Sequence, residues 1–452
     1  MQTKADKHMK NDAHNDQRLT IDQAIQLAMA MQKQSKLDQA EGIYQEVLKA
    51  VPGHPDALHF LGVLYYQRDQ TDAAIESISK AIEASPEYMD AHNNLGNIYM
   101  EKGRIKEAEV QYRRTVELAP THVGALNNLG TVLRALKQFD EAESILRGAL
   151  ENYPDFFPLH YNLGTLLYNK GQDEDAVEHF FKAVILDPEE ARSRVRLGLA
   201  LMSLGRRDEA VKVYRDWLES DPDNPEAKHL LAACSGDAVP GRASDAYVKN
   251  LFDRFADSFE EKLNILEYKA PEFVAGAVSK HCGSPDGRLA ILDAGCGTGL
   301  CGPLLKPFAM RLDGVDLSAG MLKKAGATGM YDQLSESDLT AYIRGHKGVY
   351  DVIVAADVLC YFGDLQDLFA AVADTLKPGG RFIFTLEQTG EVLEGEGGDY
   401  CIIPQGRYTH SEAYLRRVAD HQGLVPEAVG HEVLRKEFGR PVDGMVVTLA
   451  RA

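Results

Sequence analysis

A glycine-rich segment in the second half of the chain is the part best suited to bind a small molecule. Residues 293–299 read Asp-Ala-Gly-Cys-Gly-Thr-Gly and continue a short apolar run that begins at Leu289. Glycines that follow a buried strand let the nucleoside of a ligand come close to the backbone at the mouth of a parallel sheet. Residues 297–302 also satisfy the G-x-G-x-x-G dinucleotide pattern, which alone is weak evidence. The loop therefore predicts a nucleoside-containing ligand but not its kind.

Two acidic positions and one turn extend this prediction. Asp316 ends the candidate strand 311–317, where a carboxylate can accept both ribose hydroxyls; nicotinamide enzymes also place an acid there. Asp338 and Leu339 combine a carboxylate suited to an exocyclic adenine amine with a side chain that packs on the ring face. A Leu-Lys-Pro-Gly-Gly turn at 376–380 precedes the next strand.

Together with the glycine loop, these features resemble the class I methyltransferases that use S-adenosyl-L-methionine (SAM), over residues 247–452. The resemblance implies a Rossmann-like α/β domain of seven strands, favours SAM over a nicotinamide cofactor, and requires no metal. The residues that it implies for SAM binding are Asp293, Gly295, Cys296, Gly297, Thr298, Gly299, Asp316, Leu317, Met321, Asp338, Leu339 and Ala356.

Transfer of a methyl group to an amine, alcohol or thiol also needs a proton acceptor beside the reacting atom. We predict Asp357, Tyr361 and His410 as catalytic residues, with Glu387 and Tyr408 as further candidates. His410 suits proton removal near neutral pH, but it also fits a structural position before the helix-like segment 411–419. Arg407 either recognises a carboxylate or phosphate of the substrate or forms a surface ion pair.

The elements that would position these residues read as strands alternating with helices, which is the pattern of an α/β sheet. Five strand candidates are readable, at 289–295, 311–317, 350–357, 381–387 and 444–450. Two weaker candidates, before Asp338 and around 425–435, bring the expected count to seven. The segment 247–259 is either a helical lid over the cofactor or an ordinary packed amphipathic helix.

The first half of the chain repeats with a period of 34 residues. The period is marked by Pro52, Pro86, Pro120, Pro154, Pro188 and Pro222. When each proline is taken as position 32 of its unit, position 8 is Gly or Ala, position 7 is Leu and position 20 is Ala. Small residues allow two helices to cross closely, and proline ends the second helix. These columns resemble the tetratricopeptide repeat (TPR) family over residues 21–224, which implies an all-α superhelix, or solenoid, with a concave groove.

Three repeats carry an asparagine at the same position, namely Asn94, Asn128 and Asn162. That position faces the groove in TPR proteins, and an amide can donate and accept hydrogen bonds to an extended peptide. We predict these residues as peptide-binding; the alternative is that they are solvated polar residues. His92 and His160 are expected to be structural residues of the helix seam rather than metal ligands.

We expect a polar flexible N-terminus at 1–18, six repeats with a capping helix at 19–236, a linker at 237–246 and the methyltransferase domain at 247–452. The formal charge of −19 and the lack of a basic stripe disfavour nucleic acid as a partner. No segment is apolar enough to span a membrane. Six cysteines without a C-x-x-C pair indicate a reducing, cytoplasmic protein and no structural zinc.

Segments 251–256, 355–361 and 406–411 resemble bacterial methyltransferases that carry TPR repeats before the catalytic domain. The leading hypothesis is a SAM-dependent methyltransferase whose array binds a polypeptide and presents it for methylation. A small-molecule methyltransferase with the repeats as scaffold, and a TPR adaptor with an inactive catalytic domain, remain as alternatives. The oligomeric state is not predicted.

Overall fold

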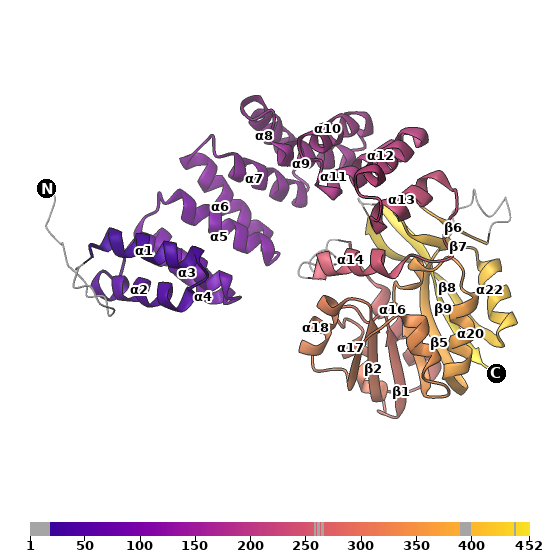
Figure 1. Ribbon diagram of the computed structural model, residues 1–452. Helices are drawn as coiled ribbons and strands as arrows, with labels where there is room; N and C mark the ends of the chain where they lie inside the picture. Colours follow the sequence, from indigo (N-terminus) through magenta and orange to yellow (C-terminus); the bar gives the residue numbers. More distant parts are fainter. Residues whose placement is uncertain (1–18, 257–258, 260–262, 264–265, 389–398, 438–439) are drawn as a thin grey trace. The chain divides into compact units, whose positions relative to one another are not determined.

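The computed structural model describes residues 19–256, 259, 263, 266–388, 399–437 and 440–452, so the prediction for 1–18 lies outside the described residues. The chain forms two compact units, Met1–Glu189 and Glu190–Ala452 (Figure 1). The first unit holds repeat helices alone, whereas the second joins the last repeat to the α/β domain.

The first unit is a series of antiparallel helix pairs. Its helices are α1 (Ile21–Lys33), α2 (Leu37–Ala50), α3 (Pro55–Gln67), α4 (Thr71–Ala84), α5 (Met89–Glu101), α6 (Ile105–Leu118), α7 (Val123–Ala135), α8 (Phe139–Asn152), α9 (Phe157–Asn169) and α10 (Asp173–Leu186). The predicted close crossings are present: a Cβ on Gly62 would lie 2.5 Å from Cγ1 of Ile78, so α3 and α4 approach at a distance that only glycine allows. The helical repeat array is therefore confirmed.

The second unit begins with α11 (Ala191–Ser203), α12 (Arg207–Ser220) and α13 (Pro225–Ser235), which correspond to the sixth repeat and the capping helix. Helices α14 (Asp245–Phe255) and α16 (Ala270–Cys282) follow. The segment predicted as a linker is tied to the loop after the fourth strand, because the Ala243 N–H donates to the Tyr361 carbonyl at 2.8 Å.

The α/β domain contains one seven-stranded sheet and one small hairpin. The strands of the sheet are β1 (Leu289–Ala294), β2 (Ala309–Asp316), β3 (Gln333–Glu336), β4 (Tyr350–Ala355), β5 (Leu376–Glu387), β8 (Leu424–Glu437) and β9 (Arg440–Arg451). Their order is β3-β2-β1-β4-β5-β9-β8, with β1 to β5 parallel and β9 antiparallel to both neighbours. The predicted seven strands are confirmed, but the hairpin of β6 (Tyr400–Ile402) and β7 (Tyr408–His410) was not foreseen.

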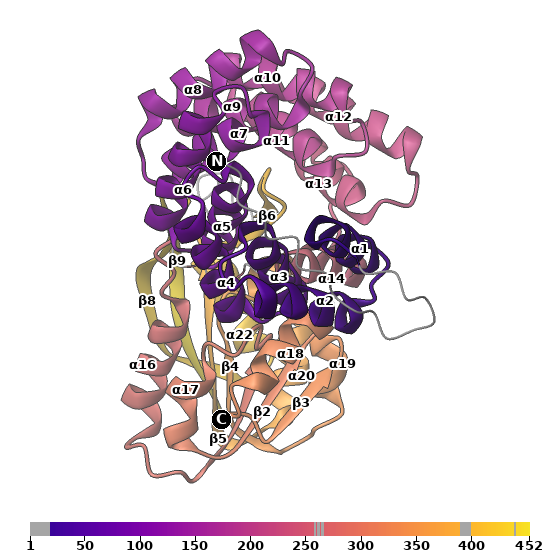
Figure 2. The same cartoon turned by 90° about the vertical axis from the view of Figure 1, so that its left-hand side faces the viewer.

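Helices cover both faces of the sheet (Figure 2). Alternate residues of the strands point to opposite faces, so Leu292 and Phe382 pack on one side and Ile291 and Ile383 on the other. The first face is covered by α19 (Leu339–Arg344), α20 (Gln366–Thr375) and α22 (Glu412–His421). The second face is covered by α16 and α17 (Gly302–Leu305). Burial on both faces explains why the parallel strands read as continuous apolar runs.

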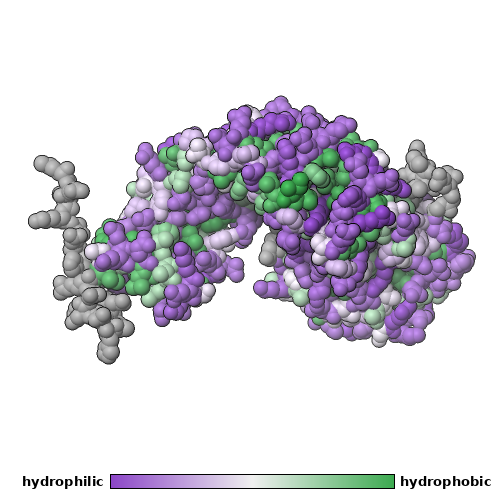
Figure 3. Space-filling view, turned by 45° about the horizontal axis from the view of Figure 1, so that its top comes forward, coloured by the Kyte–Doolittle hydropathy of each residue, from purple (hydrophilic) through white to green (hydrophobic). Residues whose placement is uncertain are grey.

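Most of the face drawn in Figure 3 is hydrophilic, in keeping with the high net charge of −19. Within the described part of the chain, no helix is long and apolar enough to cross a membrane.

Candidate active site

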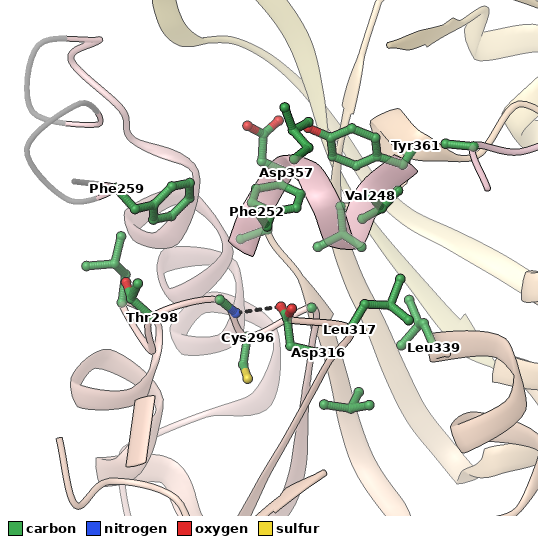
Figure 4. Close-up of a pocket in the computed structure, with 18 of the residues that line it drawn as sticks. Val248, Phe252, Phe259, Cys296, Thr298, Asp316, Leu317, Leu339, Asp357 and Tyr361 are labelled. Carbon is green, nitrogen blue, oxygen red and sulfur yellow. Dashed lines mark hydrogen bonds between the residues drawn. The ribbon is translucent and has the colours of Figure 1, made fainter. Parts of the chain in front are cut away.

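Strands β1, β2 and β4 end at one edge of the sheet, where the strand order changes direction between β1 and β4. Crevices at such topological switch points are where open α/β sheets bind ligands. A cavity of about 320 Å³ lies there, and α14 contributes Val248, Leu251 and Phe252 to its wall (Figure 4). The glycine loop and the ends of the three strands are thus brought to one site.

Most of the predicted cofactor and catalytic residues line this cavity. Those that do are Gly295, Cys296, Gly297, Thr298, Asp316, Leu317, Asp338, Leu339, Ala356, Asp357 and Tyr361. Four predicted residues do not: Asp293, Gly299, Met321 and His410.

The glycine loop is held in place by Asp316. Oδ2 of Asp316 accepts the Gly297 N–H at 2.9 Å, and Oδ1 accepts the Ser318 N–H at 2.9 Å. Gly295 has a φ of +75°, and a Cβ there would lie 2.4 Å from Cγ2 of Val358, so no other residue fits. Burial raises the pKa of Asp316 in spite of these backbone donors.

Asp293 supports the loop from inside the domain. The Tyr331 hydroxyl donates to Oδ2 of Asp293 at 2.6 Å, and a Cβ on Gly299 would lie 3.1 Å from the Tyr331 ring. Asp293 is buried, and this burial raises its pKa to about 7. Met321 is also buried, in α18 (Ala319–Ala327).

Asp338 is fixed by two contacts at the other end of the cavity. Its Oδ1 accepts the Ala341 N–H at 2.8 Å and so caps α19, while its Oδ2 accepts Nη1 of Arg242 at 2.6 Å. Arg242 also pairs with Asp245 at 2.6 Å. Sequence reasoning missed Arg242, which lies in the segment predicted as a linker and carries no motif.

The predicted catalytic residues differ in their placement. Tyr361 lies at the cavity with its ring 5.6 Å from that of Phe252, and burial raises the pKa of its hydroxyl well above the ordinary value. His410 is fully buried away from the cavity, and its Nε2 lies 3.1 Å from the Gly363 carbonyl oxygen. Burial lowers the pKa of His410 to about 4.

Asp357 is the second residue after β4 and has a φ of +59°, a backbone conformation that non-glycine residues rarely adopt. Both of its carboxylate oxygens lie 2.7 Å from Nη1 of Arg435. Arg407 is a half-buried ion-pair partner, since its Nε lies 2.6 Å from Oε1 of Glu387 and its side chain is 16% exposed. Nothing in the sequence around Arg435 indicated this role.

Asp357, Glu387 and Cys360 lie close enough together to hold a metal ion. The guanidinium of Arg435, however, contacts both carboxylates. These carboxylates therefore already share a positive charge supplied by the chain itself.

Three features of the cavity fit SAM. The positive φ angles of Gly295 and Gly297 open the loop toward a ligand. Oγ1 of Thr298 lines the cavity, is buried, and has no hydrogen-bond partner among the described residues. Among the described residues, the cavity wall carries five carboxylates against three guanidiniums, a balance that suits a cationic sulfonium: Asp245, Asp316, Asp338, Asp357 and Glu437 against Arg242, Arg407 and Arg435.

The three predicted peptide-binding asparagines each contact the preceding repeat. Nδ2 of Asn94 lies 2.8 Å from Nε2 of His59. Nδ2 of Asn128 donates to Oδ1 of Asn97 at 3.1 Å, and Nδ2 of Asn162 donates to Oδ1 of Asn127 at 2.7 Å. His92 and His160 are buried in the helix seam, and Nε2 of each lies within hydrogen-bond distance of a proline carbonyl oxygen. Both contacts are what is expected of structural residues.

Comparison with known families agrees with this arrangement. A family model described as a methyltransferase domain matches residues 292–382, and tetratricopeptide repeat models match residues 62–103, 87–155 and 161–225. The chain combines TPR repeats with a class I methyltransferase domain. The predicted fold class and enzyme class are thereby confirmed, and the cofactor of such a domain is SAM.

Curated relatives match the methyltransferase half. Human methyltransferase-like protein 27 is 29% identical over 174 residues, which are 38% of this chain and 68% of that protein. The ubiquinone biosynthesis O-methyltransferase of Thiobacillus denitrificans is 30% identical over 153 residues, which are 30% of this chain and 65% of that protein. The corresponding protein of Pectobacterium carotovorum is covered over 57% of its length, so the chain spans about two thirds or less of most of these relatives.

Two solved structures are also similar to part of the chain. PilW, a type IV pilus biogenesis factor, is 23% identical, with 47% of this chain and 98% of that chain covered and a TM-score of 0.43. PilF of Pseudomonas aeruginosa is 21% identical, with 47% and 96% covered and a TM-score of 0.41.

Proposed function

We propose that this chain transfers the methyl group of SAM to a polypeptide that its TPR array holds. The observation that carries the enzymatic part is the single cavity that the glycine loop, Asp316 and α14 form at the ends of β1, β2 and β4. SAM supplies an activated methyl group when bound there. The chain's own part is to hold the cofactor, orient the acceptor and exclude water.

Within this proposal, each part of the cavity takes one part of the cofactor. The loop 295–298 holds the methionine part, with Thr298 supplying a free hydroxyl. Asp316 accepts the ribose hydroxyls, and Asp338 with Leu339 holds the adenine. Asp293, Gly299 and Met321 then act indirectly, because they pack behind the surface that meets the ligand.

The asparagines of the array support a polypeptide as the bound partner. Because the Nδ2 atoms of Asn94, Asn128 and Asn162 are engaged with the preceding repeats, these side chains are held in position. A peptide would then donate its backbone N–H groups to the side-chain oxygens. Covalent linkage of such an array to the catalytic domain raises the local concentration of the captured chain.

The test is methyl transfer from radiolabelled SAM into a lysate of the source organism that lacks this gene. Acid-precipitable and soluble counts are measured separately. We expect counts in the precipitate, and we expect Asp316→Ala to abolish them together with SAM binding by calorimetry. Counts that appear only in the soluble fraction contradict the polypeptide acceptor while leaving the methyltransferase intact.

The role of the array is tested with full-length variants. Replacing Asn94, Asn128 and Asn162 together with alanine is expected to lower the precipitable counts about tenfold at low substrate concentration, with SAM affinity unchanged. Asn152→Ala is the matched control, because Asn152 lies exposed in the same array outside the asparagine series. Equal loss in both variants would contradict a specific peptide role.

A small apolar acceptor is the second candidate. The cavity wall opposite the glycine loop is largely apolar, with Leu251, Phe252 and Tyr361. Several curated relatives are named as ubiquinone biosynthesis O-methyltransferases. Soluble counts in the experiment above would favour this candidate.

We also propose the cytoplasm as the place of action and the residue ranges 19–236 and 247–452 as the two functional parts. All six cysteines lie within the described residues and are free, which supports a reducing compartment.

A further inference from the structure

Helix α14 closes one side of the cavity. Its side chains Val248 and Phe252 line the cavity wall, and Figure 4 shows both on the side opposite Asp316. The same helix carries Asp253, within the segment 251–256 that resembles methyltransferases with TPR repeats. Asp253 is not among the described residues that line the cavity, so it acts on a ligand there only through other residues.

A second face of α14 meets the residues that follow β2 and β3. Lys249, Asp253 and the C-cap residue Ala256 are spaced by four and three residues, so they lie on one side of the helix. Lys249 pairs with Glu336, the last residue of β3. A Cβ on Gly320 would lie 3.1 Å from Cβ of Ala256 and 3.6 Å from Oδ1 of Asp253. The helix therefore packs closely on the start of α18, which follows β2.

Asp253 is connected to Asp316 through a single residue, Ser318. The Ser318 hydroxyl donates a hydrogen bond to Oδ1 of Asp253, and the Ser318 N–H donates to Oδ1 of Asp316 at 2.9 Å. Because a carboxylate accepts hydrogen bonds and donates none, the hydroxyl proton points to Asp253 and the hydroxyl oxygen accepts the Met321 N–H at 3.1 Å. The N–H and the hydroxyl of Ser318 thus have fixed partners.

The carboxylate of Asp316 is oriented from two sides. The Gly297 N–H of the glycine loop holds its Oδ2, and the Ser318 N–H holds its Oδ1. Ser318 is fully buried, so loss of Asp253 leaves its hydroxyl proton without this acceptor at a position closed to solvent. Any shift of Ser318 that relieves this loss also moves the donor of Oδ1, and with it the plane of the Asp316 carboxylate.

The charge of Asp253 is not what a space-filling contact requires. Burial raises the pKa of Asp316, and the negative charge of Asp253 adds to that rise. Two neighbouring acids repel each other, at a cost in free energy that a neutral side chain would avoid. An acid nevertheless suits this position, because a group that only accepts hydrogen bonds sets the direction of the Ser318 hydroxyl.

We propose that Asp253 is a positioning residue for the ribose of the cofactor: through Ser318, it fixes the orientation of Asp316, which accepts the ribose hydroxyls. This inference rests on the proposed function. It gives α14 two tasks, since the helix both covers the cavity and orients an acid on the opposite wall. Asp253 itself touches neither the cofactor nor the reacting atoms, so its effect is on recognition of the ribose.

The test measures the preference of the protein for the ribose hydroxyls. S-adenosylhomocysteine and its 2′,3′-dideoxy analogue are each titrated by calorimetry into the full-length protein. We expect the wild type to bind S-adenosylhomocysteine at least about 10-fold more tightly than the analogue. Asp253→Ala should lower this preference about 5-fold and change the affinity for the analogue by less than about 2-fold. Equal losses for both ligands indicate a merely structural role and would overturn the inference.

Asp253→Asn separates the hydrogen bond from the charge. Alanine and asparagine remove the same negative charge, but asparagine keeps an oxygen that accepts the Ser318 hydroxyl. We therefore expect Asp253→Asn to retain the preference for the ribose hydroxyls. Asn250→Ala is the matched control, because Asn250 is exposed on the same helix and is not among the described residues of the cavity wall. If Asp253→Asn loses as much preference as Asp253→Ala, the hydrogen bond is not the cause and the inference is wrong.

Ser318→Ala tests the route and replaces Asp253→Ala if that variant does not fold. It removes the hydroxyl that joins Asp253 to Asp316, so it should lower the preference to the same extent. The double variant with Asp253→Ala should lose no more than Ser318→Ala alone, since both changes remove one hydrogen bond. Additive losses would show that Asp253 does not act through Ser318.

The wild-type titrations separate this inference from the proposed function. If S-adenosylhomocysteine does not bind, the methyltransferase cavity itself is contradicted, and the inference fails with it. If the wild type binds both ligands equally, or if Asp253→Ala keeps the full preference, the cavity stands and only the role of Asp253 is wrong.

Discussion

Burial determines which acidic residues near the glycine loop carry charge. Asp293 and Asp316 both have a raised pKa because burial disfavours the ionised carboxylate, and Asp293 reaches about 7. The unfolded chain would titrate Asp293 near 4. The folded state therefore holds this proton more tightly, and the stability that the protonated form contributes is lost as pH rises from about 4 through about 7.

Replacing Asp293 with asparagine should therefore change how stability depends on pH. Asparagine is neutral and still accepts the hydrogen bond that the Tyr331 hydroxyl donates. The free energy of unfolding of Asp293→Asn, relative to that of the wild type, should therefore increase by at least about 1 kcal/mol between pH 5 and pH 8. Urea unfolding at the two pH values measures this. Asp367→Asn, at an exposed acid, is the control. If the free energy of unfolding depends on pH in the same way in wild type and Asp293→Asn, the pKa of Asp293 is not raised by burial.

No histidine lies at the described cavity wall, which bears on the pH dependence of catalysis. His410 is buried, with its pKa lowered to about 4, so it stays neutral across the physiological range. The pH profile of kcat/KM should therefore keep its shape in His410→Gln, even if the variant is less stable. If the pH profile of kcat/KM loses an inflection between pH 6 and 7 in His410→Gln, then His410 is a general base after all.

Among the elements, α13 and α14 are joined by specific contacts within the second unit. The ring of His229 in α13 stacks on that of Tyr247 in α14 at 4.1 Å, and its Nε2 lies 2.7 Å from the Gly406 carbonyl oxygen. Arg254 and Glu226 form an ion pair between the same helices at 2.9 Å. Because α14 also supplies part of the cavity wall, the capping helix α13 is joined directly to a helix that lines the candidate active site.

Loss of this packing should destabilise the second unit measurably. His229→Ala removes the ring stacking and leaves the Gly406 carbonyl without its donor, at a cost of about 2 kcal/mol. The change should appear in the urea midpoint of the full-length chain and in weaker binding of S-adenosylhomocysteine. His421→Ala, at an exposed position in α22, should change neither. An unaltered midpoint for His229→Ala would show that the contact contributes nothing.

The sequence predicted those elements whose signal is local. The repeat helices follow from a strict 34-residue period, and β1 with its loop follows from an apolar run that ends in glycines. The hairpin of β6 and β7 was missed because its strands have only three residues each, too few for a visible alternation. The weak strand signal at 425–435 belongs to β8, whose outer positions are mostly polar because it lies at the sheet edge.

The ion pairs of Arg435 with Asp357 and Glu387 show what sequence reasoning could not reach. The sequence predicted Asp357 and Glu387 as candidate catalytic residues, and Arg407 either as a ligand for a carboxylate or phosphate or as part of a surface ion pair. Their actual partner, Arg435, stands 78 residues beyond Asp357 in the chain. Only the antiparallel return of β8 beside β9 brings it to the cavity, and no local pattern encodes that contact.

At the scale of the whole molecule, the compact units divide the chain at Glu189 rather than after the capping helix. A truncation that removes residues 1–236 therefore deletes α11 to α13, which belong to the same compact unit as the catalytic domain. It would uncover Tyr247 and Tyr408, which are 4% and 0% exposed. Loss of activity in such a truncation could therefore come from loss of the array or from damage to the active site, and the two effects are not separated.

Two truncations should consequently behave differently. The fragment 190–452 keeps α13 on α14, so we expect it to bind S-adenosylhomocysteine with the affinity of the full chain. The fragment 237–452 lacks that cover, and we expect its Tm to lie roughly 5–10 °C lower, with weaker binding. Differential scanning calorimetry and titration of both fragments give the comparison. Equal Tm and equal affinity would mean that the last repeat is independent of the catalytic domain, and the boundary would then lie after the capping helix.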